Sequence, residues 1–309
     1  MRLYDVVNDM RDPGRLTLAA GRLELVLSPS SGGGIARFDH VGEDGRRTEI
    51  LRGLAGSTSN ILDFACFPLV PFCNRIRGGR FNFRGRDVAL APNLPGDPSP
   101  LHGQGWLAAW DLISAGAATA DLFFFHRPGE WPWAYEARQH FALDPDGLAI
   151  TLSCLNRSDS PMPCGLGLHP YFHCTPDTVI DATVGCAWTI DGDVLPVERV
   201  PAEGRYDLRG RKACGQGLDN CFGDWDGAAR IGTPGLPVRT ILSSPDARFF
   251  QLYSPVGGGL FAAEPVTHAN AALNAPEEDW PALGLRILAP AESMMMTMRL
   301  DVIAGEEAD

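Results

Sequence analysis

Three side chains of this 309-residue chain have the types and settings that proton-transfer chemistry needs. His102 lies between a proline-rich stretch and two glycines, where the backbone can approach a ligand closely. His169 stands directly before Pro170, which favours an extended conformation and a side chain held in place. Glu264 ends a short apolar segment, so its carboxylate lies either at the rim of a cavity or in an ion pair. A partly buried carboxylate has a raised proton affinity, which suits a base working near neutrality.

Each of these residues also has a purely structural interpretation. His102 would then be a loop histidine bonded to a backbone carbonyl, and Glu264 an ion-paired acid. His169 would be a zinc ligand if it shared a helix face with His173. Pro170 and the surrounding glycines and prolines oppose such a helix, and the chain has no H-E-x-x-H carboxylate. We therefore expect no metal site.

Five arginines follow one another in an otherwise acidic chain before the next acid, Asp87: Arg75, Arg77, Arg80, Arg84 and Arg86. A solvated strand face with outward-pointing side chains explains the last four. Arg75 differs, because the pair Asn74-Arg75 follows an apolar, proline-rich segment. We expect the Arg75 side chain to project from that rigid segment into a cleft.

Short segments that alternate apolar and polar residues predict strands throughout the chain. They occupy Leu16–Ala20 and residues 23–27, 80–84, 133–141, 183–190, 248–253, 260–263 and 293–302. Turn chemistry such as Asp144-Pro145-Asp146-Gly147 joins neighbouring segments into hairpins. Helical periodicity and βαβ alternation are nearly absent, which favours antiparallel sheets packed face to face. We predict an all-β fold, a large antiparallel β-sandwich in a single domain over residues 1–309, with residues 91–100 as a loop that delivers His102.

Composition narrows the partners and the compartment. A net charge of −12 and a pI near 5.0 repel phosphate backbones and acidic lipids, which argues against nucleic acid and membrane as partners and favours a neutral substrate. Eight cysteines without a C-x-x-C motif are typical of a reducing compartment. The chain begins with acids and a proline rather than an apolar signal, and no apolar run approaches the ~20 residues of a membrane span. We expect a cytoplasmic protein.

In their order along the chain, these motifs resemble the aldose 1-epimerase (galactose mutarotase) family. The resemblance covers the chain from Phe67 onward and rests on six successive steps. They are Asn74-Arg75 before Gly79-Arg80-Phe81, His102-Gly103 with Trp106 and Trp110, His169-Pro170-Tyr171-Phe172, Leu218-Asp219, Gln251-Leu252-Tyr253, and Glu264-Pro265 followed by Ala272 and Asn274. Single steps of this kind are common by chance, whereas six in sequence are not.

The resemblance implies the antiparallel β supersandwich of that family and an isomerase that interconverts the α and β anomers of a free aldose. Glu264 would take the proton of the anomeric hydroxyl, and His169 would protonate the ring oxygen as the ring opens. His102 would hydrogen-bond the developing charge near that oxygen. Four further side chains would hold the sugar hydroxyls: Asn74, Arg75, Asp219 and Gln251. The partner would be a monosaccharide, with no cofactor or metal, and the protein a monomer or homodimer.

Three points remain open at this stage. A nearby Glu264 should raise the proton affinity of His169, although burial would oppose that rise. Asn220 follows Asp219 where many relatives carry histidine, and His173-Cys174 follows the His-Pro-Tyr-Phe step, so the accepted hydroxyl pattern is open. Two alternatives are a hexose 6-phosphate epimerase, in which the arginines bind phosphate, and a noncatalytic sugar-binding or regulatory module. Retention of both an acid and a base argues against the module.

Overall fold

The computed structural model describes residues 14–54 and 60–304. Nearly all regular structure there is β-strand, and every pair of strands is antiparallel. Six short 3-10 turns interrupt the strands, and the described ranges contain no α-helix. Within those ranges no helix is long and apolar enough to cross a membrane. The prediction of an all-β, antiparallel fold is confirmed.

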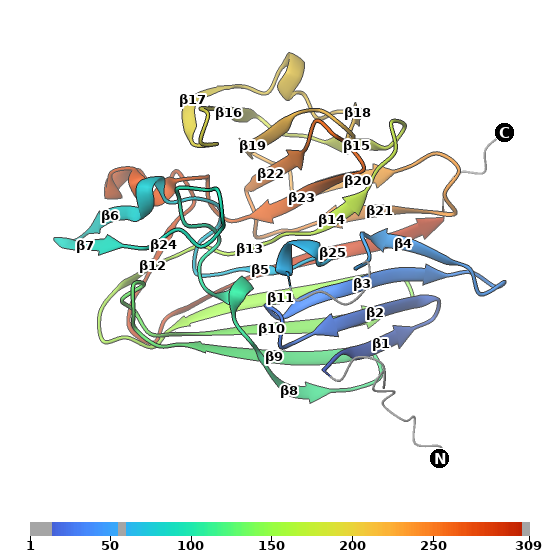
Figure 1. Ribbon diagram of the computed structural model, residues 1–309, viewed down its shortest axis with the longest axis horizontal. Helices are drawn as coiled ribbons and strands as arrows, with labels where there is room; N and C mark the ends of the chain where they lie inside the picture. Colours follow the sequence, from blue (N-terminus) through green and yellow to red (C-terminus); the bar gives the residue numbers. More distant parts are fainter. Residues whose placement is uncertain (1–13, 55–59, 305–309) are drawn as a thin grey trace.

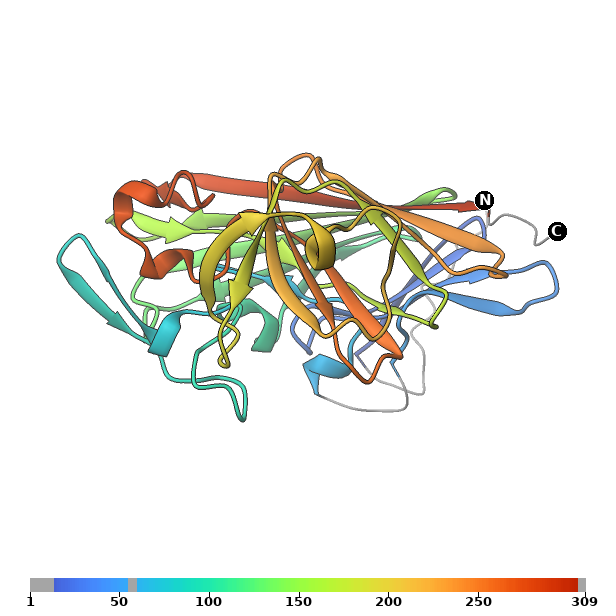
Figure 2. The ribbon, with the colours of Figure 1, turned by 90° about the horizontal axis from the view of Figure 1, so that it is seen from above.

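The largest sheet has nine strands in the order β18-β15-β20-β21-β25-β11-β10-β9-β8 and forms one long layer of the molecule (Figures 1 and 2). Along β10 buried residues alternate with more exposed ones, as expected for a strand with one face on the core. The strands are β8 Asp111–Ala115, β9 Thr119–His126, β10 Tyr135–Asp144, β11 Gly147–Asn156, β15 Val179–Ala182, β18 Arg211–Lys212, β20 Ala228–Gly232, β21 Val238–Ser243 and β25 Ser293–Ala304.

An eight-stranded sheet lies across this layer, in the order β17-β16-β19-β22-β23-β13-β5, with β14 paired to β23 (Figure 2). Its strands are β5 Pro68–Leu69, β13 Gly167–Leu168, β14 Tyr171–His173, β16 Cys186–Ile190, β17 Pro196–Pro201, β19 Leu218–Gly223, β22 Phe249–Ser254 and β23 Leu260–Val266. This sheet carries most of the residues that the sequence singled out.

Three smaller sheets complete the structure. The first is a four-stranded meander of β1 Leu16–Ala20, β2 Leu23–Ser28, β3 Gly34–Val41 and β4 Arg47–Leu51. The others are the hairpin of β6 Arg80–Phe83 with β7 Arg86–Ala89, and the pair β12 Met162–Cys164 with β24 Arg286–Leu288. On the hairpin, alternate residues point outward, so Arg80, Arg84 and Arg86 are exposed as predicted.

The predicted strands exist, but several bounds and many short strands were missed. The strand predicted at residues 133–141 begins at Tyr135 and continues to Asp144. The one predicted at 183–190 begins only at Cys186. The strand predicted to include Arg84 ends at Phe83, because Arg84 has a φ of 53° and starts the turn.

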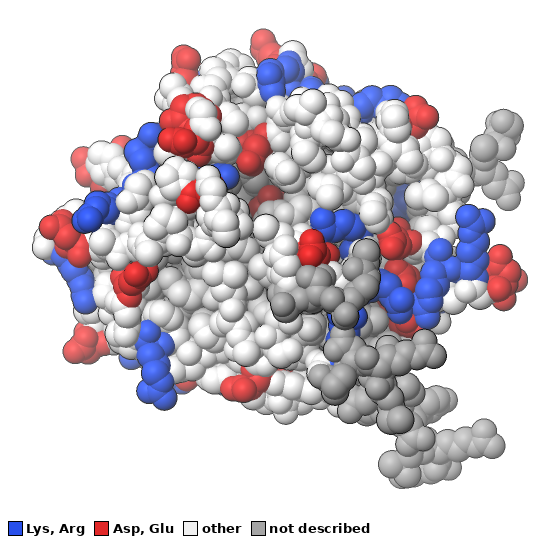
Figure 3. All heavy atoms as spheres, viewed as in Figure 1, with Lys and Arg blue, Asp and Glu red and all other residues white. Residues whose placement is uncertain are grey.

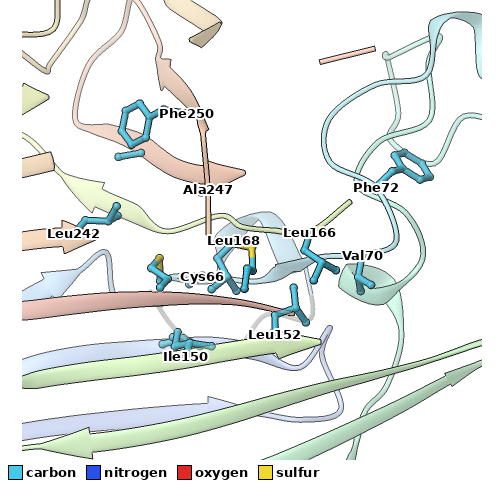
Figure 4. Close-up of a cluster of buried hydrophobic side chains, with 14 of the residues drawn as sticks. Cys66, Val70, Phe72, Ile150, Leu152, Leu166, Leu168, Leu242, Ala247 and Phe250 are labelled. Atoms are coloured by element: carbon cyan, nitrogen blue, oxygen red, sulfur yellow. The ribbon is translucent and has the colours of Figure 1, made fainter. Parts of the chain in front are cut away.

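The main core lies between the nine-stranded and eight-stranded sheets (Figure 4). Ile150 and Leu152 of β11 belong to one cluster of buried side chains with Leu168 of β13 and Phe250 of β22. Burying side chains of this size stabilises the fold by about 1.5–3 kcal/mol each. The eight-stranded sheet is therefore fixed on a packed layer, and its other face is available to build a site.

A single glycine ties the loop of His102 to the end of β5. The Val70 carbonyl accepts hydrogen bonds from the Gln104 and Gly105 amides, and the Val70 amide donates to the His102 carbonyl. Gly103 has a φ of 72°, and a Cβ there would come within 2.1 Å of the Val70 carbonyl oxygen. Only glycine permits this close approach.

We predict that Gly103→Ala destabilises the protein by about 3 kcal/mol or more, because left-handed strain and a backbone clash combine. Gly85→Ala is the matched control, since Gly85 has a φ of 80° but open space around its Cα. The control should cost only about 1 kcal/mol. Urea unfolding of both variants measures the difference, and equal losses would show that the contact with Val70 is unimportant.

Candidate functional site

Four polar residues of the site lie on, or directly after, four neighbouring strands of the eight-stranded sheet. Asp219 lies on β19, Gln251 on β22 and Glu264 on β23, while His169 follows β13. Gln251 and Glu264 are direct cross-strand partners, so their side chains project from the same face of the sheet. The site thus follows from strand order and register.

His169 and Glu264 contact each other at the base of the site. The Nε2 atom of His169 lies 3.2 Å from Oε1 of Glu264. The exposed fractions are 6% for His169 and 2% for Glu264, so water screens this contact little. A distance of 3.2 Å places the imidazole and the carboxyl group within reach of each other for proton transfer.

Burial sets the charge state of this pair. It raises the pKa of Glu264 well above its usual range, and the charge of Asp219 adds to the rise while that of Arg75 opposes it. Burial lowers the pKa of His169 to about 3. The rise expected for His169 beside a carboxylate is therefore wrong, because desolvation outweighs the attraction. Burial thus favours the uncharged forms of both groups in the free protein.

Two hydrogen bonds join His102 and Asn74. The His102 amide donates to the Asn74 carbonyl over 3.0 Å, and the Asn74 amide donates to Nδ1 of His102 over 3.1 Å. Since Nδ1 accepts, the neutral ring carries its hydrogen on Nε2. Burial lowers the pKa of His102 well below its usual range, and the charges of His169 and Arg75 lower it further. His102 is thus a neutral hydrogen-bond donor, with its ring centroid 5.5 Å from that of His169.

Arg75 lies between two carboxylates. Its Nε is 2.8 Å from Oδ2 of Asp97, and its Nη1 is 3.9 Å from Oδ2 of Asp219. Gln251 donates from Nε2 to Oδ1 of Asp219 over 2.7 Å. Its own Oε1 is buried and has no hydrogen-bond partner among the described residues. Burial raises the pKa of Asp219, against the opposing effects of Arg75 and Gln251.

This geometry agrees with comparisons to known proteins. A sequence model of the aldose 1-epimerase family matches residues 14–301. The chain belongs to the aldose 1-epimerase family. The uncharacterised protein YphB of Escherichia coli K12 is 34% identical over 298 residues, which cover 93% of this chain and 98% of YphB.

Solved structures share the fold across nearly the whole chain. A crystal structure of a proposed aldose 1-epimerase from Escherichia coli K12 has a TM-score of 0.83 at 32% identity, covering 94% of this chain and 99% of that one. A galactose mutarotase-like protein from Clostridium acetobutylicum has a TM-score of 0.82 at 18% identity, with 94% and 95% covered. The predicted supersandwich of the family is thereby confirmed.

In this aldose 1-epimerase family member, the structure brings together all seven residues proposed from the sequence, on or beside the eight-stranded sheet: Asn74, Arg75, His102, His169, Asp219, Gln251 and Glu264. His173, the neighbour considered as a zinc ligand, points elsewhere. It is exposed and pairs with Glu49 over 2.8 Å.

Sequence reasoning missed three residues that hold the site together. Asp97 comes from the 91–100 loop and binds Arg75. His268 accepts the Cys73 amide at Nε2 over 2.8 Å, and Asn270 accepts the Arg75 amide over 3.2 Å. His268 and Asn270 follow Glu264-Pro265 closely, and a polar run directly after a buried strand is the signal that could have found them.

The remaining arginines of the cluster lie at the surface. Arg77 pairs with Asp191 and Arg84 with Glu277, while Arg86 lies over the ring of Trp133. On the face shown in Figure 3, basic and acidic side chains are mixed and gather mainly toward the edge. Asn274, part of the family motif, supports the backbone by accepting the Arg77 amide over 2.7 Å.

We predict that stability falls at mildly acidic pH because of His268. Burial lowers its pKa in the folded protein to about 4, against about 6.5 in an unfolded chain. Between these values only the unfolded chain binds the proton, so the free energy of unfolding falls as the pH falls from about 7 to 4, by about 3 kcal/mol. Urea unfolding at several pH values measures this loss.

His268→Gln should remove that contribution and make the pH dependence less steep, while the lowered pKa values of His102 and His169 maintain the rest of it. His140→Asn is the control, because His140 is exposed and lies on β10 of the nine-stranded sheet. An equally steep pH dependence in His268→Gln and wild type would show that His268 is not the source.

Proposed function

We propose that this protein is an aldose 1-epimerase that interconverts the α and β anomers of a free aldose by general acid/base catalysis. The observation that carries the proposal is the buried 3.2 Å contact between His169 Nε2 and Glu264 Oε1. In a cyclic aldose, the anomeric hydroxyl and the ring oxygen are bonded to the same carbon. An acid and a base at neighbouring positions can therefore address both oxygens at once.

The proposed reaction moves two protons and needs no redox change. The Glu264 carboxylate takes the proton of the anomeric hydroxyl, the C1–O5 bond breaks as the C1 carbonyl forms, and His169 protonates O5. Rotation about C1–C2 turns the aldehyde, and the two transfers reverse on its other face. The ring closes as the opposite anomer. Both proton carriers end in the state in which they began.

The pKa directions fit these roles. A carboxylate with a raised pKa is a stronger base, and an imidazolium with a lowered pKa is a stronger acid. The proposed reaction begins from the ionised pair, with the Glu264 carboxylate and the His169 imidazolium. Ring opening returns the pair to a protonated Glu264 and a neutral His169, which is the state that burial favours.

The other polar groups suit sugar binding. The His102 ring lies beside that of His169, and its Nε2–H would stabilise negative charge near the ring oxygen. Asn74, Arg75, Asp219 and Gln251 would bind hydroxyls through charge-assisted hydrogen bonds. The orphaned Oε1 of Gln251 adds an acceptor that the free protein leaves unused.

The charges of the site favour a free sugar over a phosphorylated one. Two carboxyl groups, those of Asp97 and Asp219, lie beside Arg75. The Arg75 guanidinium is already bound by Asp97. The phosphate alternative requires the arginines of the β6–β7 hairpin to bind phosphate. There, Arg84 pairs with Glu277 and Arg86 lies over the ring of Trp133. A phosphate group would meet uncompensated negative charge.

We predict that His169→Asn and Glu264→Gln each lower kcat for mutarotation by about 10²–10⁴ with smaller effects on KM, because each removes one proton carrier. Optical rotation of freshly dissolved α-glucose, α-galactose and several pentoses measures this. His173→Asn and Glu49→Gln are matched controls, since they make the same changes in an exposed His–Glu contact. Both controls should retain wild-type kcat.

Two results would contradict the proposal. A wild-type protein that binds sugars tightly but turns over none of them would favour the noncatalytic module. Activity that survives in both His169→Asn and Glu264→Gln would overturn the assigned mechanism.

We also predict that kcat/KM for glucose 6-phosphate is lower than for glucose by about 10–10²-fold, because like charges brought together cost several kcal/mol. The comparison uses the wild-type protein at constant ionic strength. An equal or higher kcat/KM for the phosphate would instead support the 6-phosphate epimerase.

A further inference from the structure

The imidazole of His169 is held by aromatic rings rather than by a hydrogen bond at Nδ1. Its ring centroid lies 4.6 Å from that of Phe67, with 31° between the planes, and 4.5 Å from that of Tyr171, with 34°. Nδ1 is buried and has no hydrogen-bond partner among the described residues. A catalytic histidine is usually oriented by a partner at its second nitrogen. Here packing must set the ring orientation.

Arg52, which follows β4, contacts Tyr171 twice. Its guanidinium carbon lies 4.2 Å from the centroid of the Tyr171 ring, within the range of a cation–π contact. Its backbone amide donates to the Tyr171 carbonyl over 2.8 Å. Both the ring and the backbone of Tyr171 are therefore fixed by a single residue.

The same guanidinium also holds the segment that leads to the second ring. Nη2 of Arg52 donates to the carbonyls of Leu62 and Phe64 over 2.6 and 2.7 Å. Three residues later the chain reaches Phe67, whose carbonyl accepts the His169 amide over 3.0 Å. Arg52 thus connects both rings that pack on His169.

We propose that Arg52 is a positioning residue for His169, which it holds in place through the Tyr171 ring and through the segment that ends at Phe67. Its effect on catalysis rests on the function proposed above. Its effect on the imidazole itself does not, and can be measured without any substrate.

The charge of Arg52 acts in the same direction as burial. It opposes protonation of His169, which makes the protonated ring a stronger acid. The other titratable groups that face this ring come from three separate elements: Glu264 of β23, His102 of the loop before η3 (Gly105–Leu107) and Tyr171 of β14. Cys66, of the segment before β5, lies beside the backbone of His169.

The test compares Arg52→Met, Arg52→Lys and the control Arg86→Met. Arg86 also lies over an aromatic ring, that of Trp133, at 5.4 Å, but on the β6–β7 hairpin. The readouts are kcat and KM for mutarotation and the ¹⁵N NMR shifts of the His169 imidazole across pH.

We expect Arg52→Met to lower kcat by about 10–10²-fold with KM within about 2-fold, because the acid is misplaced while sugar binding persists. The His169 titration should move to higher pH by up to about one unit. Arg52→Lys should restore the titration but not kcat, since lysine keeps the charge and lacks the planar fork. Arg86→Met should change neither.

Wild-type kcat in Arg52→Met, or a loss confined to KM, would overturn the inference. If Arg52→Met does not fold, Tyr171→Leu decides, because it removes the intervening ring and leaves the Arg52 bonds to Leu62 and Phe64. Unchanged kcat in that variant would also overturn it. If the wild type shows no mutarotation, the proposed function fails, while the NMR shifts of His169 still test the positioning.

Discussion

The structure depends on the burial of an acid and a base against each other. His169 and Glu264 are 3.2 Å apart and almost fully removed from water, so neither holds a charge as it would in solution. A buried carboxylate is costly unless it is protonated, and burial raises the pKa of Glu264 toward that neutral form. In the proposed reaction, this proton is available where the sugar ring would open. Stability and reactivity are thus two results of one contact.

The scaffold around this contact is more rigid than a loop-built site would be. Adjacent strands present Asp219, Gln251 and Glu264 on one face, and a packed core lies beneath the sheet. The loops contribute Asn74 and His102, yet these two exchange hydrogen bonds and behave as one unit. Little rearrangement is needed for the polar groups to converge.

Local patterns predicted the parts of the structure that depend on neighbouring residues. Alternation located β1 and most of the long strands, and the setting of His169 before Pro170 marked a fixed side chain. Strands of two residues, such as β13, carry no alternation and exist only through their partners. The bond between Arg75 and Asp97 joins separate loops, and the low pKa of His169 results from burial by several elements. Neither the Arg75–Asp97 bond nor the low pKa of His169 can be predicted from a local stretch of sequence.

The register of β22 against β23 limits how this protein can diverge. Side chains alternate between the two faces of a sheet, so losing or gaining one residue within β22 would turn Gln251 away from Glu264. Changes in chain length are tolerated only at connections, such as the turn at residues 255–259, where Val256 is 82% exposed. A change in what the site binds must therefore arise by substitution in place, or by remodelling the loop that carries Asp97, while strand lengths stay constant.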